Sequence, residues 1–146
     1  MMNIRNLEDH DFPPVWDIFK TAFPMKYGIE FQDAWRLRDT KHSYGGFINN
    51  CLAGFMLVRW KPDDDWHIEF LGVNPQCQKG GIGTTLLHAL LEFCKQTKSR
   101  ATLIPVEDER LIQWYKKQGF VDCGPPRKSS YTGDLEQLME FQSILV

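Results

Sequence analysis

The sequence has no excess of basic charge. Its 146 residues include 17 lysines and arginines against 19 aspartates and glutamates, and the two signs are mixed along most of the chain. A protein that binds nucleic acid through its phosphates needs a basic face, which a formal net charge of −2 does not provide. We therefore expect no nucleic-acid partner.

Cysteines are also few, and they lie far apart. Cys51, Cys77, Cys94 and Cys123 form neither a CxxC pair nor the close spacing of a zinc site, and they are too few for a disulfide scaffold. The sequence therefore predicts no bound metal. It also predicts a reducing compartment, for which the cytoplasm is the default.

Long apolar stretches are missing as well. The longest run, around residues 52–58, is far shorter than the ~20 residues that a helix needs to span a bilayer. The N-terminus lacks the apolar core of a signal peptide. We therefore expect no membrane segment.

The chain does contain enough apolar sequence for one domain, covering residues 1–146, with a core that needs no disulfide or metal. Helices are predicted at about 13–23, 30–38, 84–94 and 109–118, the first capped by Asp9 or Asp11. Strands are predicted near residue 4 and at 46–48, 52–58, 66–73, 101–106, 120–123 and 135–145. Residues 125–130 read as a loop.

Two strand details bear on the fold. Asn49-Asn50 tolerates positive φ, so residues 46–58 are predicted to form a β-hairpin. In the strand at 66–73, simple alternation places one group of side chains on one face and a second group on the other. The first group is Trp66, Ile68 and Phe70, and the second is His67, Glu69 and Leu71.

The order of these elements predicts an α/β fold. The strand–helix–strand unit at residues 66–106 requires one right-handed parallel crossover, whereas the hairpin pairs antiparallel. We therefore expect a mixed, mostly antiparallel sheet flanked by helices.

A glycine-rich loop at residues 78–84 (QKGGIGT) joins a predicted strand to a predicted helix. Glycines let consecutive backbone N–H groups turn toward one point, and the helix N-terminus adds partial positive charge, which suits a pyrophosphate. The loop lacks the Lys-Ser/Thr pair of a Walker motif and does not match the dinucleotide fingerprint.

Gln78-x-x-Gly81-x-Gly83 matches another signature, Gln/Arg-x-x-Gly-x-Gly/Ala, and the sequence thereby resembles the GNAT N-acetyltransferase superfamily. The preceding strand end at 71–75 (LGVNP) is typical of that family, and residues 114–120 (WYKKQGF) look like its helix-to-strand motif. The resemblance extends from about residue 3 to residue 141. It implies a single N-acetyltransferase domain with a GNAT-like acyl-CoA N-acyltransferase fold.

The resemblance implies that acetyl-CoA is the acyl donor. Backbone amides of the glycine loop would surround its pyrophosphate, with the Thr84 hydroxyl as an added donor and Lys79 as added charge. The pantetheine arm would run as an extra strand beside Leu71 and Val73, where an amide polarises the thioester carbonyl. The implied cofactor-binding residues are Leu71, Val73, Gln78, Lys79, Gly80, Gly81, Ile82, Gly83, Thr84, Asp108 and Tyr115.

Two catalytic residues are implied as well. Tyr115 stands where the family commonly places a tyrosine that protonates the departing thiolate, and a reference pKa of about 10 keeps it protonated at neutral pH. Glu69 stands where many members use a carboxylate to accept the amine proton, directly or through water, and His67 is the nearest alternative. Tyr115 could instead only pack, in a stripe with Leu111 and Trp114, and Glu69 could be a solvated strand residue.

The sequence departs from the family at two positions. Asp108 replaces a frequent asparagine, and an ionised carboxylate cannot donate a hydrogen bond to pantetheine. Leu111 replaces a frequent alanine and would change how closely the cofactor packs.

The resemblance leaves the acceptor open. An aromatic group, Phe23, Tyr27, Phe31 and Trp35, lies where the family builds its acceptor pocket, although core packing explains these residues equally well. We expect direct acetyl transfer to a primary amine of a small molecule or a protein. The alternative is a non-catalytic acyl-CoA-binding sensor or interaction module. An exposed last strand would support a homodimer.

Overall fold

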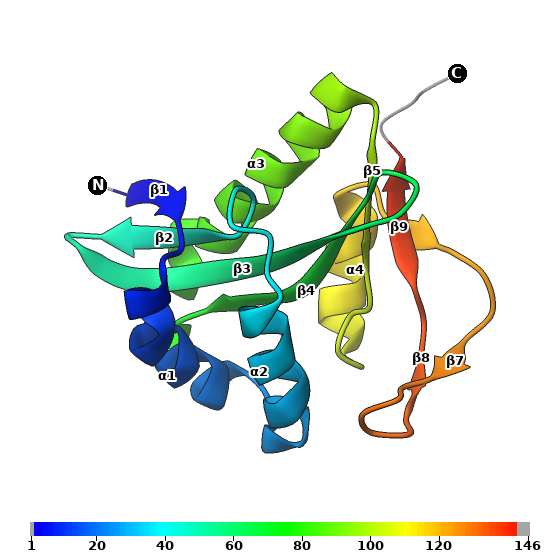
Figure 1. The fold of residues 1–146 in the computed structure, drawn as a ribbon, viewed down its shortest axis with the longest axis horizontal. Coiled ribbons are helices and arrows are strands. Elements are labelled where there is room, and N and C mark those ends of the chain that lie inside the picture. Colours follow the sequence, from blue (N-terminus) through cyan, green and yellow to red (C-terminus); the bar gives the residue numbers. More distant parts are fainter. Residues whose placement is uncertain (1, 143–146) are drawn as a thin grey trace.

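The structure is a computed structural model that describes residues 2–142, apart from the side chains of residues 78 and 79. Its centre is a seven-stranded sheet in the order β1-β2-β3-β4-β5-β9-β6 (Figure 1). The strands are β1 (Met2–Asn6), β2 (Tyr44–Ile48), β3 (Cys51–Lys61), β4 (Asp65–Val73), β5 (Arg100–Leu103), β6 (Val121–Asp122) and β9 (Met139–Gln142). Only the β4–β5 pair is parallel, which confirms the predicted mixed, mostly antiparallel sheet.

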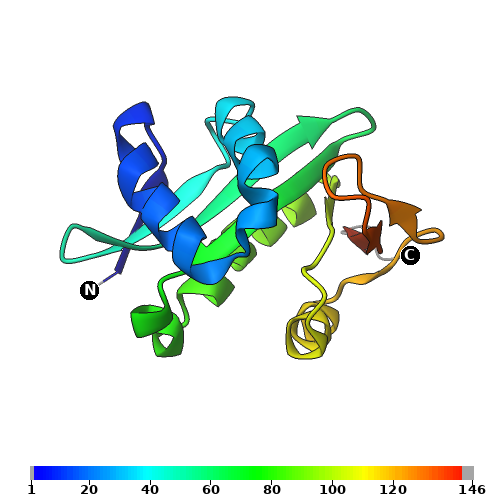
Figure 2. The same cartoon turned by 90° about the horizontal axis from the view of Figure 1, so that it is seen from below.

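Helices cover both faces of this sheet (Figure 2). On one face lie α1 (Phe12–Ala22) and α2 (Gly28–Arg36), and on the other lie α3 (Ile82–Thr97) and α4 (Glu109–Lys117). Short 3-10 turns occupy Asp9–Asp11, Met25–Tyr27 and Pro75–Gly80. All four predicted helices are therefore present.

The start of α1 differs in one detail from the prediction. Asp11 stands at the N-cap, but its carboxylate does not cap the helix. It accepts hydrogen bonds from the Arg5 guanidinium at 2.8 and 3.0 Å and from the Glu8 backbone N–H at 2.8 Å. Asp11 thus ties β1 to the first helix.

Aromatic rings fill the core between α1, α2 and the sheet. The rings of Phe19 and Phe31 stack with their centroids 4.2 Å apart, and Phe70 of β4 meets Phe31 at 5.2 Å. Phe31 is fully buried, and Trp35 packs against the same cluster. For these two members of the predicted aromatic group, core packing is therefore the correct interpretation.

A β-bulge in β4 overturns the predicted alternation. Leu57 of β3 pairs with Phe70 and Val58 pairs with Ile68, so Glu69 is an extra residue without a partner in β3. A bulge shifts every later side chain to the opposite face. Phe70 consequently joins the α1–α2 core, while Leu71 packs on the α3 face with Ile68.

The chain after α4 also differs from the prediction. The loop contains a small hairpin of β7 (Arg127–Lys128) and β8 (Leu135–Glu136), and β9 follows as a separate strand. β9 lies between β5 and β6, so the last strand is not at the sheet edge. β6 pairs only with Met139 and Glu140, so within the described chain Phe141 and Gln142 of β9 have no strand partner on that side. The homodimer stays a prediction.

The parallel pair in the sheet is short. β5 pairs only with Asp65–Ile68 of β4, although β4 continues to Val73. Beyond Ile68 the two strands separate, and the backbone of β4 on that side has no strand partner. This divergence opens the centre of the molecule.

Candidate active site

A groove of about 550 Å³ follows the divergence of β4 and β5. The end of β4, the glycine loop, the start of α3 and the inner side of α4 form its walls. Its lining residues are Ala22, Phe23, Leu71, Gly72, Val73, Gly81, Gly83, Thr84, Val106, Asp108, Arg110, Leu111, Trp114 and Tyr115. Most of the predicted cofactor-binding residues therefore line one groove.

The glycine loop is shaped by its backbone. Gly81 has φ 72° at the N-cap of α3, a left-handed conformation that favours glycine, and its carbonyl accepts hydrogen bonds from the backbone and hydroxyl of Thr85. The side chain of Ile82 is fully buried, so only its backbone is available to a ligand. Gly80 is exposed beside the groove, and the predicted contribution of the Lys79 side chain lies outside the described residues.

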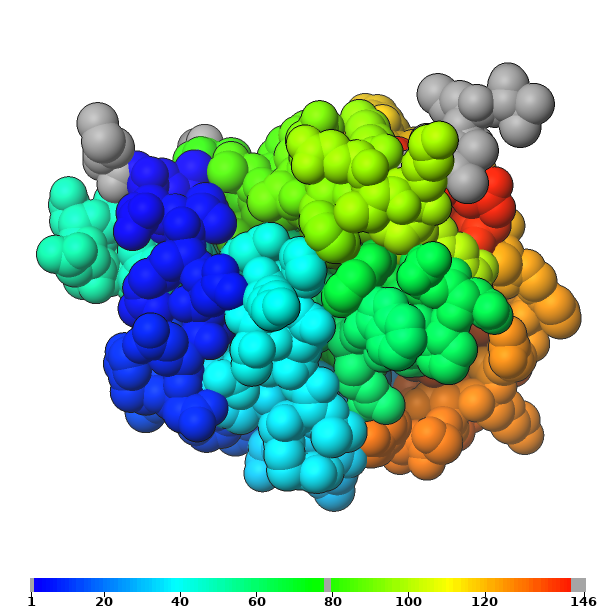
Figure 3. All heavy atoms as spheres, turned by 45° about the horizontal axis from the view of Figure 1, so that its top comes forward, coloured from blue at the N-terminus to red at the C-terminus, as the bar shows by residue number. Residues whose placement is uncertain are grey.

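A second hollow of about 490 Å³ lies on the other side of the molecule's centre, between α2, the β3–β4 hairpin and the β7–β8 hairpin. Figure 3 shows these three segments, cyan, green and orange, side by side at the surface. We call this hollow the acceptor pocket. Its lining residues are Glu30, Ala34, Arg59, Lys61, Asp65, His67, Glu69, Ile104, Pro125, Arg127, Lys128, Ser129, Ser130, Tyr131, Glu136 and Leu138.

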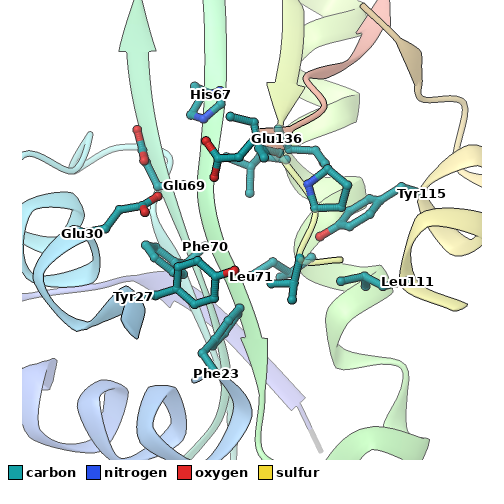
Figure 4. Close-up of a pocket in the computed structure, with 15 residues that line it drawn as sticks. Phe23, Tyr27, Glu30, His67, Glu69, Phe70, Leu71, Leu111, Tyr115 and Glu136 are labelled. Atoms are coloured by element: carbon teal, nitrogen blue, oxygen red, sulfur yellow. The ribbon is translucent and has the colours of Figure 1, made fainter. Parts of the chain in front are cut away.

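A small pocket of about 60 Å³, whose lining residues Figure 4 shows, lies between the two, and we call it the passage. It shares five residues with the groove, Phe23, Leu71, Val106, Leu111 and Tyr115. It shares five others with the acceptor pocket, Glu30, His67, Glu69, Ile104 and Glu136. A ligand in the groove and a ligand in the acceptor pocket would therefore meet in this passage.

Tyr115 stands on the groove side of the passage. It is only 5% exposed and belongs to the core that α3 and α4 share, yet Figure 4 shows its hydroxyl directed into the passage toward Leu71. Burial raises its pKa well above the usual range, so the hydroxyl holds its proton. The residue thus both packs and presents a proton donor.

Glu69 stands on the opposite side, where the bulge in β4 directs its carboxylate into the acceptor pocket. Burial raises its pKa, and the nearby cations Lys61 and Arg59 partly offset this. The Arg59 guanidinium lies 3.9 Å from the carboxylate. Glu69 is thus a partly desolvated carboxylate that lines both the passage and the acceptor pocket.

His67 has an orienting partner that the sequence did not reveal. The Thr102 hydroxyl donates to Asp65 at 2.6 Å, so its oxygen accepts a hydrogen bond from Nδ1–H of His67 at 2.8 Å. Burial, reinforced by Lys61 and Arg59, lowers the His67 pKa to about 3. At neutral pH the ring is therefore neutral with its Nε2 lone pair free.

Two further carboxylates were missed at the sequence level. Glu30 of α2 and Glu136 of β8 meet Glu69 in the acceptor pocket, although they are distant in sequence (Figure 4). Burial, reinforced by the charges of Glu136 and Glu69, raises the Glu30 pKa to about 7. Glu30 lay within a predicted helix with aromatic residues at helical spacing, and Glu136 lay near the start of the predicted last strand. Neither position carried a sequence motif that indicated a functional carboxylate.

The family model of the acetyltransferase (GNAT) family matches residues 4–120, which is most of the chain. The chain belongs to this family. Members of the family transfer an acetyl group from acetyl-CoA, and the predicted class of enzyme is thereby confirmed. No curated protein matches the chain in sequence.

Solved GNAT structures share the fold over nearly the whole chain. The ribosomal-protein-S18-alanine N-acetyltransferase of Escherichia coli is 20% identical with a TM-score of 0.78, covering 100% of this chain and 96% of its own. Ard1 of Thermoplasma volcanium is 20% identical with a TM-score of 0.80 and 99% coverage of both chains. The PaiA N-acetyltransferase of Thermoplasma acidophilum, solved with coenzyme A, is 17% identical with a TM-score of 0.73, covering 97% and 99%.

The two departures from the GNAT pattern have structural consequences. Asp108 caps α4 by accepting a hydrogen bond from the Arg110 backbone N–H at 2.9 Å, so one of its oxygens is already engaged. Leu111 lines both the groove and the passage, where an alanine would leave more room. The chain therefore has a narrower passage than the usual alanine would give.

Within residues 2–142, no three His, Cys, Asp or Glu side chains are grouped so that they could hold a metal ion. No helix in the same part of the chain is long and apolar enough to cross a membrane.

Proposed function

We propose that this chain transfers the acetyl group of acetyl-CoA directly to a primary amine, with Tyr115 as general acid and Glu69 as general base. The observation that carries the proposal is the passage between the groove and the acceptor pocket. A phenolic proton donor stands on its groove side and a desolvated carboxylate on its acceptor side. An amine and a thioester could react there without a covalent enzyme intermediate.

The groove fits the acyl donor. The glycine loop presents backbone N–H groups and the N-terminus of the sixteen-residue α3, which suit a pyrophosphate. Thr84 lines the groove and can add a hydroxyl donor. The backbone of β4 beyond Ile68 lacks a strand partner on the β5 side, so its amide groups can pair with an extended pantetheine arm.

When bound, acetyl-CoA supplies an activated thioester carbonyl. The Glu69 carboxylate accepts a proton from the amine, directly or through a water, as the new C–N bond forms. The Tyr115 hydroxyl donates its proton to the sulfur as the C–S bond breaks. The backbone at Leu71 provides an N–H dipole for the oxygen on which charge develops.

The neutral His67 supports Glu69 as the base. A ring whose pKa is about 3 has little affinity for a proton near neutral pH, and its Nδ1 is engaged with Thr102. A carboxylate whose pKa is raised by burial is better matched to the task.

The test is release of the coenzyme A thiol from acetyl-CoA with purified protein and a panel of amines and peptides, corrected for hydrolysis. We expect multiple turnovers with at least one class of amine. Binding of acetyl-CoA without transfer to any amine would instead favour a non-catalytic sensor.

The Tyr115→Phe variant tests the acid. Loss of the hydroxyl should lower kcat by about 100-fold, the usual contribution of a general acid, with little change in the KM for acetyl-CoA. Tyr44→Phe is the control, since Tyr44 is half-buried and packs against the same core but lines neither hollow. An unchanged kcat in Tyr115→Phe would remove this residue from the mechanism.

A further inference from the structure

Charges in the acceptor pocket are segregated by depth. Its inner end, at the passage, carries the carboxylates of Glu30, Glu69 and Glu136, which line the passage as well. Its remaining wall carries one carboxylate, Asp65, which already accepts a hydrogen bond from Thr102 and lies 3.9 Å from Arg100. The same wall carries four cationic side chains that do not reach the passage. These are Arg59, Lys61, Arg127 and Lys128.

The inner end lacks a hydrogen-bond donor. Oε1 of Glu30 is enclosed by protein, and no described residue donates to it. Burying a carboxylate oxygen without a donor is costly, and here two further carboxylates raise the cost. An ammonium group offers three donors and a positive charge, and would satisfy the Glu30 oxygen together with its neighbours.

Arg59 lies 3.9 Å from the Glu69 carboxylate, but the other three outer cations are unpaired. Within the described chain, no carboxylate oxygen lies within 4.0 Å of Lys61, Arg127 or Lys128. Arg127 and Glu136 are direct partners across the β7–β8 hairpin, yet they form no ion pair. Two opposite charges that could neutralise each other are held apart, one toward each end of the pocket.

The hairpin that carries two of these cations is fastened in place. Lys26 forms an ion pair with Asp134 at 2.8 Å, and the Tyr131 hydroxyl donates to Asp33 at 2.9 Å. Both contacts join the α2 region to the turn between β7 and β8. The positions of Arg127 and Lys128 relative to the inner carboxylates are therefore set by the fold.

We infer that the acceptor is amphoteric: a primary amine whose other end carries a carboxylate or phosphate. Its ammonium group binds at Glu30, Glu69 and Glu136, and its anionic group binds near Arg127 and Lys128. This inference rests on the proposed acetyl transfer and names the class of substrate. A diamine would place its second positive charge against the outer cations, and a plain alkylamine would leave them without a partner.

The inference is tested with acceptors matched in chain length. For three to six carbons, kcat/KM is measured for the ω-aminoalkanoate, the ω-aminoalkylphosphonate, the n-alkylamine and the α,ω-diamine. We expect the best anionic acceptor to exceed the alkylamine and the diamine of equal length by at least about tenfold, as one charge-assisted hydrogen bond can provide. Peptides with an acidic or a neutral second residue then show whether the anionic group belongs to a free compound or to a peptide.

Variants locate the two ends of the pocket. In the double variant Arg127→Gln/Lys128→Gln, the preference for the anionic acceptor over the alkylamine should fall toward one. Lys116→Gln/Lys117→Gln removes the same charge from exposed positions on α4 outside the pocket and should keep the preference. Glu30→Gln should raise the KM for every amine.

The outcomes separate this inference from the proposed function. If kcat/KM is higher for a diamine or an alkylamine than for the anionic acceptor, the inference is overturned and acetyl transfer still stands. An equal loss of preference in both double variants also overturns it. No transfer to any amine or peptide would overturn both.

Discussion

Three carboxylates line both the acceptor pocket and the passage, and their neighbours give them different properties. Glu69 has two cations nearby, which partly offset the effect of burial on its pKa. Glu30 has no such neighbour, and burial together with two negative charges raises its pKa to about 7. Glu69 is therefore ionised over a wider pH range than Glu30, as a general base requires.

Replacing Glu69 should show this role directly. Glu69→Gln keeps the shape of the side chain but cannot accept the amine proton, so kcat/KM should fall by about 100-fold. The limb of the pH profile that reports ionisation of the base should also disappear.

His67→Gln is the comparison variant, because His67 lines the same passage and is the alternative base. We expect it to cost less activity than Glu69→Gln in the same thiol-release assay, with thermal unfolding used to confirm that both variants fold. A larger loss in His67→Gln would transfer the role of base to the imidazole.

Among the elements, β4 contributes most to the site. Its first half pairs with β5 and its second half diverges, while the bulge between them directs Glu69 into the pocket. The paired half is held by side chains as well as by its ladder, since the Thr102 hydroxyl of β5 joins Asp65 and His67 of β4. Thr102 is fully buried, so no solvent replaces this hydroxyl.

Thr102→Val should therefore destabilise the fold although it keeps the volume of the side chain. Asp65 would lose its donor and His67 its acceptor, and we expect a loss of about 1–3 kcal/mol in the free energy of unfolding, measured with urea. Thr102→Ser retains the hydroxyl and is the control. Equal stability of the valine variant and the original protein would show that this chain of hydrogen bonds is not stabilising.

For the molecule as a whole, the acceptor pocket makes the free energy of unfolding depend on pH. The Glu30 pKa is about 7 in the folded state against 4.5 in the unfolded chain. The folded protein thus binds the Glu30 proton more tightly than the unfolded chain does. The contribution of Glu30 to the free energy of unfolding is therefore fully present below pH 4.5 and is lost as pH rises through 7. Glu69, Glu136 and Tyr131 are the titratable groups that interact with it, and they contribute to the same change.

Glu30→Gln should remove the loss of stability that ionisation of Glu30 causes at high pH. The variant should unfold with nearly the same free energy as the original protein at pH 5, and should be more stable by about 1–2 kcal/mol at pH 8, after allowance for partial exposure. Urea unfolding at the two pH values is the measurement. A stabilisation that does not grow with pH would show that Glu30 is not the strained group.

Much of the fold could be predicted because it depends on local pattern. Asn49 and Asn50 both adopt positive φ, as the predicted hairpin requires, and Gly81 does the same at the start of α3. Buried Leu86, Leu87, Leu90 and Cys94 follow the spacing that indicated that helix. Two short motifs then identified the family, because a phosphate loop depends on consecutive residues.

The tertiary structure decided what the local pattern could not. The bulge in β4 placed the side chains of Phe70 and Leu71 on the sheet faces opposite to those predicted. A bulge depends on how two strands pair, which a single strand's pattern does not reveal. Glu30 and Glu136 meet only because α2 and the β7–β8 hairpin, which are distant in sequence, both line one pocket. The sequence by itself determined the elements, the family and the acyl-donor loop, whereas the arrangement of charges around the acceptor arises from contacts between distant segments.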